Sequence, residues 1–229
     1  MSFIVIEGLD GSGKSTQVKK LTNYFTDKGI ACKFLHFPQL EKGIYGDLIA
    51  RFLRGDMGDI NNVDPYLVAL IYAGDRKEAA TMVQQWIDDG NMVIMDRYVY
   101  SNIAFQCAKL DTKEQKQQLA KWILNLEFEY HTIPKPDVNI FLDVPFTFTQ
   151  KRLTETRTGE DREYLKGKQD IHEASLDFQK KVWEIYYWQV EQFDDFYAID
   201  CKGNTNEMLT PDETFAKILK TINFIDELK

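Results

Sequence analysis

The strongest constraint on the fold of this chain is a glycine-rich turn of fixed spacing near residue 10. Residues 8–15 read GLDGSGKS and match the pattern GxxxxGK(S/T). The apolar run at residues 3–6 precedes the turn, and a stretch with Val18, Leu21 and Phe25 on one helical face follows it. In that context the glycines let backbone N–H groups wrap a phosphate, and the helix N-terminus adds partial positive charge. The sequence therefore predicts a strand, a phosphate-binding loop and a helix as one unit.

The side chains of this loop indicate a nucleoside triphosphate with Mg²⁺. Lys14 is placed to reach the donor phosphates, Ser15 to ligate Mg²⁺, and Thr16 to cap the helix. The predicted loop set for ATP is Gly8, Asp10, Gly11, Ser12, Gly13, Lys14, Ser15 and Thr16. This signal does not identify a reaction.

Apolar runs alternate with helical patterns along the rest of the chain. Further strands are predicted at residues 31–37, 92–95, 137–142 and 196–199. Strands that alternate with helices imply an α/β fold with a parallel sheet covered on both faces. Such sheets bind ligands at the carboxyl ends of their strands, which is where the polar signals of this chain lie.

Several helix starts are legible as well. Asp64-Pro65 predicts the start of a long helix that Gly74 is expected to bend, and Thr112 with Gln115 forms a capping-box pattern. A later helix is predicted to include Ile171, Phe178, Val182 and Ile185, and the polar segment between these helices, residues 156–169, reads as a mobile loop.

Composition narrows the class of protein. The chain has 229 residues, 44% hydrophobic and 28% charged, with a net charge of −8, and we expect one domain over residues 1–229 without a linker. An acidic surface disfavours nucleic-acid binding, and no apolar run approaches the roughly 20 residues that span a bilayer. The N-terminus is interpreted as a first strand, not a signal peptide. Cys32, Cys107 and Cys201 show neither disulfide nor zinc spacing, which favours a cytoplasmic location.

Two charged residues follow the third predicted strand. Asp96 is placed to hold Mg²⁺ through water, and a strand-end capping carboxylate is the alternative. Arg97 is placed to bind phosphates bidentately, and an ion pair with Asp96 or another neighbour is its alternative.

With these residues the chain resembles the thymidylate kinase family. The resemblance rests on the phosphate loop, Phe37-Pro38, the runs LIYAGDR at 70–76 and DRYVYSNIAFQ at 96–106, FLDVP at 141–145, and an arginine-bearing lid. It implies a P-loop NTPase fold of about five parallel strands with a mobile lid near residues 156–169. It also implies transfer of the γ-phosphoryl group of ATP to dTMP, with Mg²⁺, in a homodimer for which the long helix at 64–86 offers a candidate face.

The resemblance assigns the acceptor site residue by residue. Tyr72 stacks on thymine, Arg76 hydrogen-bonds a thymine carbonyl, and Asn102 binds the Watson–Crick edge. Ser101 shapes that pocket, Phe105 crowds the sugar C2′, and Asp10 positions Arg97 or contacts the 3′-hydroxyl. The predicted substrate set is Asp10, Phe37, Tyr72, Arg76, Arg97, Ser101, Asn102 and Phe105. For Tyr72 a core position, and for Arg76 a solvated charge, are the alternatives.

The chain departs from the family at the acceptor phosphate. The family often has the run Phe-Pro-x-Arg, whose arginine grips the monophosphate, where this chain has Phe37-Pro38 followed by Gln39, Leu40, Glu41 and Lys42. Lys42 or Arg51 is therefore expected to substitute, or Arg97 to bind more of the acceptor phosphate. The phosphate loop also lacks an arginine, which favours a catalytic arginine in the lid, Arg157 first and then Arg162, with Arg152 on the stem near the ATP phosphates.

The predicted chemistry needs no general base, because a monophosphate oxygen is ionised at pH 7. Lys14, Arg97, a lid arginine and Mg²⁺ suffice to position and neutralise the transferred group. Two alternatives stay open: a kinase of another pyrimidine acceptor such as dUMP or a deoxynucleoside, and a nucleotide-binding regulator without catalysis.

Overall fold

The computed structural model describes residues 2–40, 42–60, 62–154, 160–168, 170–173, 175–205 and 207–228, without the side chains of 154, 160–162 and 226–228. In this part of the chain five strands form one parallel sheet in the order β2-β3-β1-β4-β5. The strands are β1 (Phe3–Glu7), β2 (Cys32–His36), β3 (Met92–Asp96), β4 (Val138–Asp143) and β5 (Phe196–Asp200). The predicted α/β class with a parallel sheet is confirmed.

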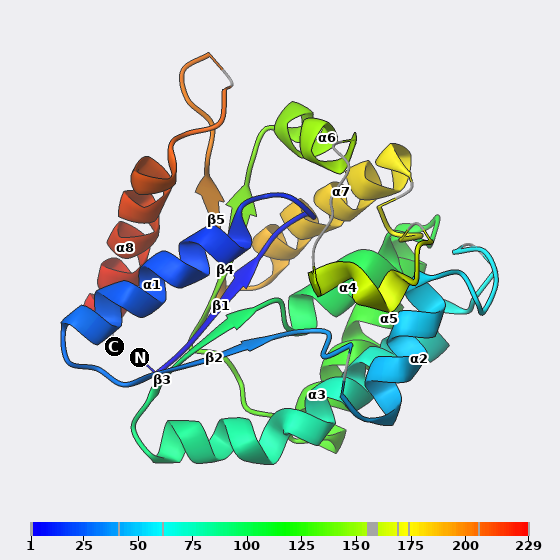
Figure 1. The fold of residues 1–229 in the computed structure, drawn as a ribbon, viewed down its shortest axis with the longest axis horizontal. Helices are drawn as coiled ribbons and strands as arrows, with labels where there is room; N and C mark the ends of the chain where they lie inside the picture. The colour runs from blue at the N-terminus through cyan, green and yellow to red at the C-terminus, as the bar shows by residue number, and fades with distance from the viewer. Residues whose placement is uncertain are drawn as a thin grey trace.

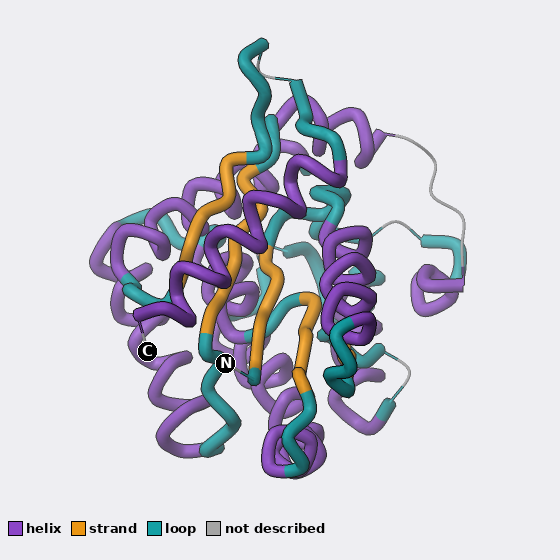
Figure 2. Tube along the Cα trace, turned by 90° about the vertical axis from the view of Figure 1, so that its left-hand side faces the viewer, coloured by secondary structure: helices purple, strands orange, loops and turns teal. Residues whose placement is uncertain are grey.

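Helices cover both faces of the sheet (Figures 1 and 2). α1 (Lys14–Asp27) and α8 (Pro211–Leu228) pack on one face, where Ile4 and Ile6 of β1 join their apolar side chains. The opposite face, with Phe3 and Val5, carries the larger core. Its helices are α2 (Gly43–Leu53), α3 (Pro65–Asp88), α4 (Val99–Cys107), α5 (Lys113–Leu124) and α7 (Leu176–Gln192).

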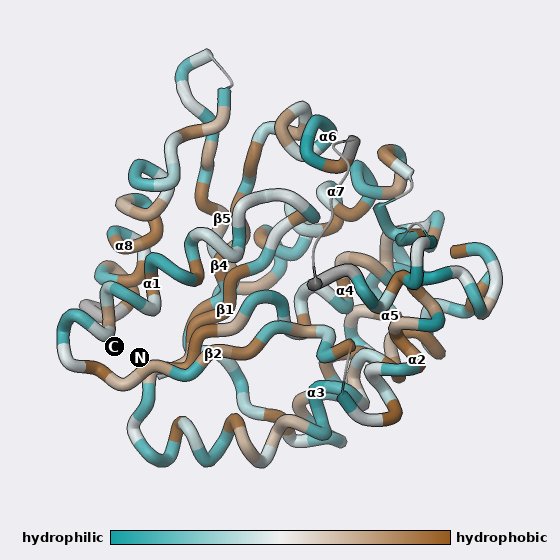
Figure 3. Tube along the Cα trace, in the orientation of Figure 1, coloured by the Kyte–Doolittle hydropathy of each residue, from teal (hydrophilic) through white to brown (hydrophobic). Residues whose placement is uncertain are grey.

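The remaining elements are α6 (Phe146–Thr154), the π-helical turn η1 (Asn125–Tyr130) and the 3₁₀ turn η2 (Glu160–Leu165). Hydropathy follows the same layers, because the apolar positions concentrate along the central strands and the inner faces of the helices (Figure 3). No helix in the described ranges is both long and apolar enough to cross a membrane.

The predicted helix starts at Asp64 and Thr112 are confirmed. The Asp64 carboxylate accepts from the N–H of Tyr66 at 2.8 Å, and Thr112 with Gln115 forms the capping box.

One helix detail differs from prediction, and Gly74 has a packing role that the sequence does not indicate. α3 continues unbroken through Gly74, where a Cβ would lie 2.2 Å from the ring of Tyr45. The glycine therefore admits a packed ring and does not interrupt the helix. The prediction that Ile171 belongs to a helix is wrong, because Ser175 caps α7 and Ile171 lies before it.

The segment expected to act as a lid contacts α2 over its described part. Arg54, at the end of α2, donates through Nη1 to the carbonyl of Tyr164 in η2 at 2.8 Å. Lys168 pairs with Asp56 at 2.7 Å, and the N–H of Ile171 donates to the carbonyl of Leu53 at 3.0 Å. Residues 155–159 and 169 lie outside the described residues.

Candidate functional site

A cavity of about 420 Å³ opens at the carboxyl ends of the central strands. Its walls come from the phosphate loop, the end of β3, α3, α4 and the segment between η2 and α7. It brings together most of the predicted site residues: Asp10, Gly11, Lys14, Ser15, Phe37, Tyr72, Arg76, Asp96, Arg97, Ser101, Asn102 and Phe105.

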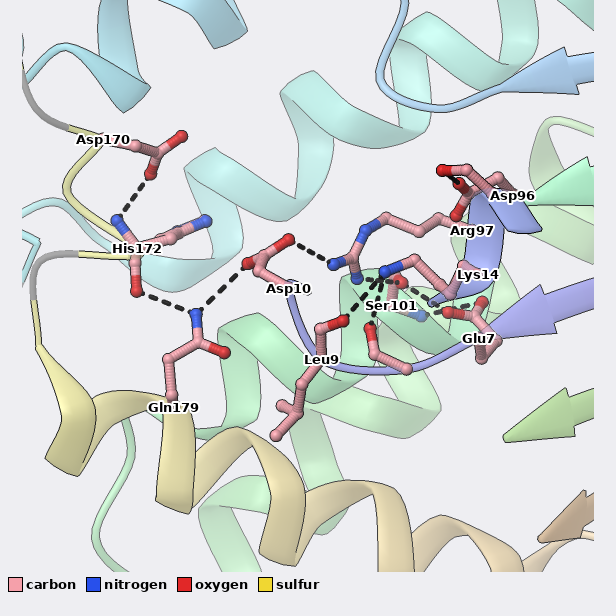
Figure 4. A network of polar contacts seen from close by, with 12 residues as sticks. Glu7, Leu9, Asp10, Lys14, Asp96, Arg97, Ser101, Asp170, His172 and Gln179 are labelled. Atoms are coloured by element: carbon pink, nitrogen blue, oxygen red, sulfur yellow. Dashed lines mark hydrogen bonds and ion pairs between the residues drawn. The ribbon is translucent and has the colours of Figure 1, made fainter. Parts of the chain in front are cut away.

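The phosphate loop places a buried lysine, Lys14, at the N-terminus of α1. Gly13 has φ 89° directly before the helix, a left-handed backbone that favours glycine. The Lys14 amino group donates to the carbonyls of Leu9 at 2.9 Å and Gly8 at 3.3 Å (Figure 4). Burial, together with the positive charge of Arg97, lowers the pKa of Lys14 to about 8. An anion that approaches the loop therefore stabilises the charged form of Lys14.

Ser15 and Asp96, the two residues predicted to hold Mg²⁺, lie next to each other. The Ser15 hydroxyl lies 3.5 Å from Oδ2 of Asp96, and Nδ1 of His36 lies 3.4 Å from the same oxygen. Burial alone would raise the pKa of Asp96, but the charge of Lys14 and the contact with His36 lower it overall. The other carboxylate oxygen, Oδ1, is buried and has no hydrogen-bond partner within the described residues. An ionised carboxylate with an unused oxygen beside a hydroxyl suits a hard cation.

Arg97 bridges the phosphate loop and α4. It has φ 68°, a strained backbone for a residue other than glycine, and its side chain lines the cavity. Its Nη2 donates to Oδ1 of Asp10 at 2.7 Å, and its Nη1 donates to the hydroxyl of Ser101 at 3.0 Å (Figure 4). Burial alone would raise the pKa of Asp10, but the Arg97 guanidinium lowers it well below its usual range. Arg97 thus pairs with Asp10, which agrees with the positioning role predicted for that carboxylate.

A buried carboxylate that the sequence analysis did not select lies behind Arg97. Glu7 accepts from the N–H of Tyr98 at 2.9 Å and the hydroxyl of Tyr186 at 3.0 Å, and it also accepts from the Ser101 hydroxyl. Burial raises the pKa of Glu7. These bonds fix the turn between β3 and α4, and they therefore fix the backbone position from which the Arg97 side chain extends.

The opposite end of the cavity carries Tyr72, Arg76 and Asn102. Arg76 is 2% exposed, so a solvated charge is excluded, and it forms a bidentate ion pair with buried Glu127. Tyr72 lines the cavity while its ring also packs against the larger core. Glu127 belongs to no recognisable sequence motif. It lies 51 positions from Arg76 along the chain, so the sequence does not indicate the pair.

Four wall residues from the segment before α7 were missed: Tyr164, Asp170, His172 and Glu173. Among them the Tyr164 hydroxyl donates to Asp170 at 2.7 Å, and the His172 carbonyl accepts from Gln179 at 2.9 Å. Gln179 in turn donates to Asp10 at 3.2 Å (Figure 4). His172, which the sequence left without a role, is buried with its Nε2 unpartnered in the described structure. The only local signal was a run of polar and aromatic residues, which specifies no partner.

Other predicted cations lie elsewhere. Arg152 is not among the cavity-lining residues, and its guanidinium carbon lies 5.5 Å from the ring centroid of Phe148. Arg157 falls outside the described residues, as does the side chain of Arg162. Neither Lys42 nor Arg51 lines the cavity, and the residue that replaces the missing arginine stays a prediction. The described cationic side chains in the wall are Lys14, Arg76 and Arg97, with His36 and His172 beside them.

Asp170 provides a pH-dependent stability prediction. Burial, with the nearby Asp10 charge, raises the pKa of Asp170 from 3.8 to about 7. Between these values the folded protein keeps a proton that the unfolded chain has released, so rising pH lowers the free energy of unfolding, by at most about 4 kcal/mol. In Asp170→Asn we expect this loss to disappear, because an amide does not titrate, while it can still bond His172 and Tyr164.

Urea unfolding at pH 4, 6 and 8 measures the effect as the difference between wild type and Asp170→Asn. The variant should gain relative to wild type as pH rises. A difference that stays constant across the range would contradict the raised pKa.

The fold and the site together define a class of protein. One cavity joins the phosphate loop and its lysine, the Ser15–Asp96 pair and the two buried arginines Arg76 and Arg97, which is the arrangement of a P-loop nucleotide kinase.

The comparisons identify the family. A sequence model of the thymidylate kinase family matches residues 6–210. The thymidylate kinase of Mycobacterium tuberculosis is 32% identical over 184 residues, which cover 80% of this chain and 83% of that protein. That of Plasmodium falciparum is also 32% identical, covering 80% and 75%. A solved thymidylate kinase from Candida albicans superposes with a TM-score of 0.72 at 25% identity, covering 100% of this chain and 93% of the other. The chain belongs to the thymidylate kinase family and is an ATP-dependent nucleoside monophosphate kinase.

Proposed function

We propose that this chain transfers the γ-phosphoryl group of ATP to dTMP, giving dTDP and ADP, in the cavity described above. The observation that carries the proposal is the polar pair at the base end. Arg76 offers N–H donors there, and Asn102 offers a carbonyl oxygen with no partner in the described structure. Thymine presents a matching carbonyl at C4 and an N–H at N3. Tyr72 beside them supplies a ring for stacking, worth about 1–3 kcal/mol per base.

Arg97 binds and orients the acceptor phosphate in this proposal. Its guanidinium lies between the phosphate loop and α4, so a monophosphate beside it points toward Lys14. Asp10 fixes that guanidinium or contacts the sugar 3′-hydroxyl. Phe105, over whose ring the guanidinium carbon lies 5.1 Å from the centroid, occupies the space where a ribose 2′-hydroxyl would lie.

The reaction itself is a direct displacement. An oxygen of the dTMP phosphate attacks the γ-phosphorus, the bond to the β–γ bridging oxygen breaks, and ADP leaves. Lys14 and the loop N–H groups hold the donor phosphates and offset the charge that develops on the transferred group. An arginine of the lid region 156–169 completes the set, Arg157 first and then Arg162, with Arg152 on the stem.

Mg²⁺ fits the Ser15–Asp96 pair. Within the described residues no group of three His, Cys, Asp or Glu side chains gathers around a cation, so the protein would supply few ligands. That agrees with Mg²⁺, which takes one or two protein oxygens and completes its shell with water and nucleotide phosphates. When bound, the ion neutralises charge on the donor phosphates.

The test is ADP release with ATP against dTMP, dUMP, dCMP, dGMP and thymidine, with and without Mg²⁺. We expect the highest kcat/KM for dTMP and activity only with the metal. Preference for dUMP or thymidine would favour the other acceptor classes. Absence of turnover with every acceptor, while ATP still binds, would favour a regulator.

The assembly and location are proposed together with the function. We infer a homodimer through α3, whose exposed face carries Leu67, Leu70 and Met82, because exposed apolar side chains along one helix suit helix packing between copies. Sedimentation equilibrium of the full chain measures the mass directly, and a monomer at micromolar concentration would contradict it. A cytoplasmic location suits the three free cysteines.

A further inference from the structure

Glu127 is buried behind the base end of the cavity. It belongs to the π-helical turn η1, is 0% exposed, and is not itself a cavity-lining residue. A carboxylate with no access to solvent must be compensated by its neighbours. The identity of these neighbours indicates what it does.

The first neighbour is Arg76. Its Nε donates to Oε2 of Glu127 at 2.8 Å, and its Nη2 donates to Oε1. This bidentate geometry fixes the plane of the guanidinium as well as its position. The remaining nitrogen, Nη1, makes only a long contact of 3.5 Å with the carbonyl of Tyr98. Arg76 therefore keeps donor capacity on the cavity side.

The second neighbour is Asn102. Its Nδ2 donates to Oε1 of Glu127 at 3.1 Å and to the carbonyl of Ala69 at 3.0 Å. Both partners can only accept hydrogen bonds, so only the amide nitrogen can face them. A flipped amide would set its oxygen against a carboxylate and a carbonyl. The amide orientation is thus fixed, and Oδ1 is the one polar atom of this side chain without a partner in the described structure.

We propose that Glu127 is a positioning residue that sets the hydrogen-bond polarity of the base site, with a donor from Arg76 beside an acceptor from Asn102. That polarity matches a pyrimidine with a carbonyl at C4 and an N–H at N3. Cytosine has an amino group at C4 and a bare N3, which would set donor against donor and acceptor against acceptor. Glu127 therefore makes the site select thymine or uracil over cytosine. The inference rests on the proposed function.

The experiment compares kcat/KM for dTMP and dCMP, at saturating ATP and Mg²⁺, in wild type, Glu127→Gln and Glu127→Asp. The glutamine variant removes one of the two strict acceptors that fix the amide of Asn102, because its new side chain can donate as well as accept, and only the Ala69 carbonyl then favours the original orientation. The aspartate variant keeps a negative charge for Arg76 but is one methylene shorter, so we expect its carboxylate to withdraw from Asn102. In both we expect the dTMP/dCMP ratio to fall by about 10-fold or more, with the KM for ATP unchanged.

Glu129→Gln is the matched control. Glu129 lies on the same turn but is exposed, 3.4 Å from Lys135, and its variant should keep the wild-type ratio. Circular dichroism and thermal unfolding establish whether each variant is folded. If the glutamine variant is unfolded, the aspartate variant decides the outcome. An equal loss for both nucleotides, with an unchanged ratio, would overturn the positioning role. A wild-type enzyme without preference for dTMP would instead contradict the proposed function.

Discussion

Arg97→Ala lowers kcat/KM for dTMP by about 10³-fold or more, by analogy with arginines that stabilise phosphoryl transfer. The reason is geometric: Arg97 is the buried cation between the phosphate loop and the acceptor pocket, and Lys42 and Arg51 do not line the cavity. The sheet and both cores do not depend on it, so the fold should survive. Steady-state kinetics with circular dichroism measure the two effects separately.

Arg51→Ala is the control for that result. Arg51 is exposed on α2, 3.8 Å from Asp47, and its loss should leave turnover unchanged. If the two variants lost activity to a similar degree, the acceptor phosphate would have to be bound at the α2 end of the cleft, and the role given to Arg97 would be wrong.

Lys14→Met should lower kcat by about 10²–10³-fold, the usual cost of removing one preorganised donor from developing charge. The amino group is held by two loop carbonyls and is largely desolvated, so methionine, of similar length, replaces its packing but not its charge. Rapid-quench measurement of the transfer step reports the effect directly. Lys19→Met, an exposed position on the same helix, should be silent, and a transfer rate in Lys14→Met within a few fold of wild type would contradict the assignment.

The parts of the fold that the sequence predicts well are those with local causes. A phosphate loop, a capping box and apolar runs each depend on residues within a few positions, so the strands, the α3 start at Asp64 and the Lys14 region were predictable. Helices α2 and α4 were not predicted, because nothing marks their starts: Lys42 and Tyr98 precede them without a side-chain cap.

The parts of the site that escaped prediction depend on long-range pairing. Glu127 reaches Arg76 across 51 positions, and Gln179 reaches Asp10 across 169. Neither residue type, nor its immediate neighbours, encodes such a partner. Gly74 also depends on a residue far along the chain, because a glycine is needed there to make room for the ring of Tyr45 from a different helix.

The contacts of the Asp10 carboxylate limit how the phosphate loop can be engineered. Asp10 is part of the loop proposed to hold the donor phosphates, yet its carboxylate accepts from Arg97, the arginine proposed for the acceptor, and from Gln179 of α7. The loop therefore cannot be exchanged for another phosphate loop without affecting the rest of the site. A transplanted loop of the same consensus but without an acid at this position would still cradle ATP, and it would leave the other half of the catalyst untethered.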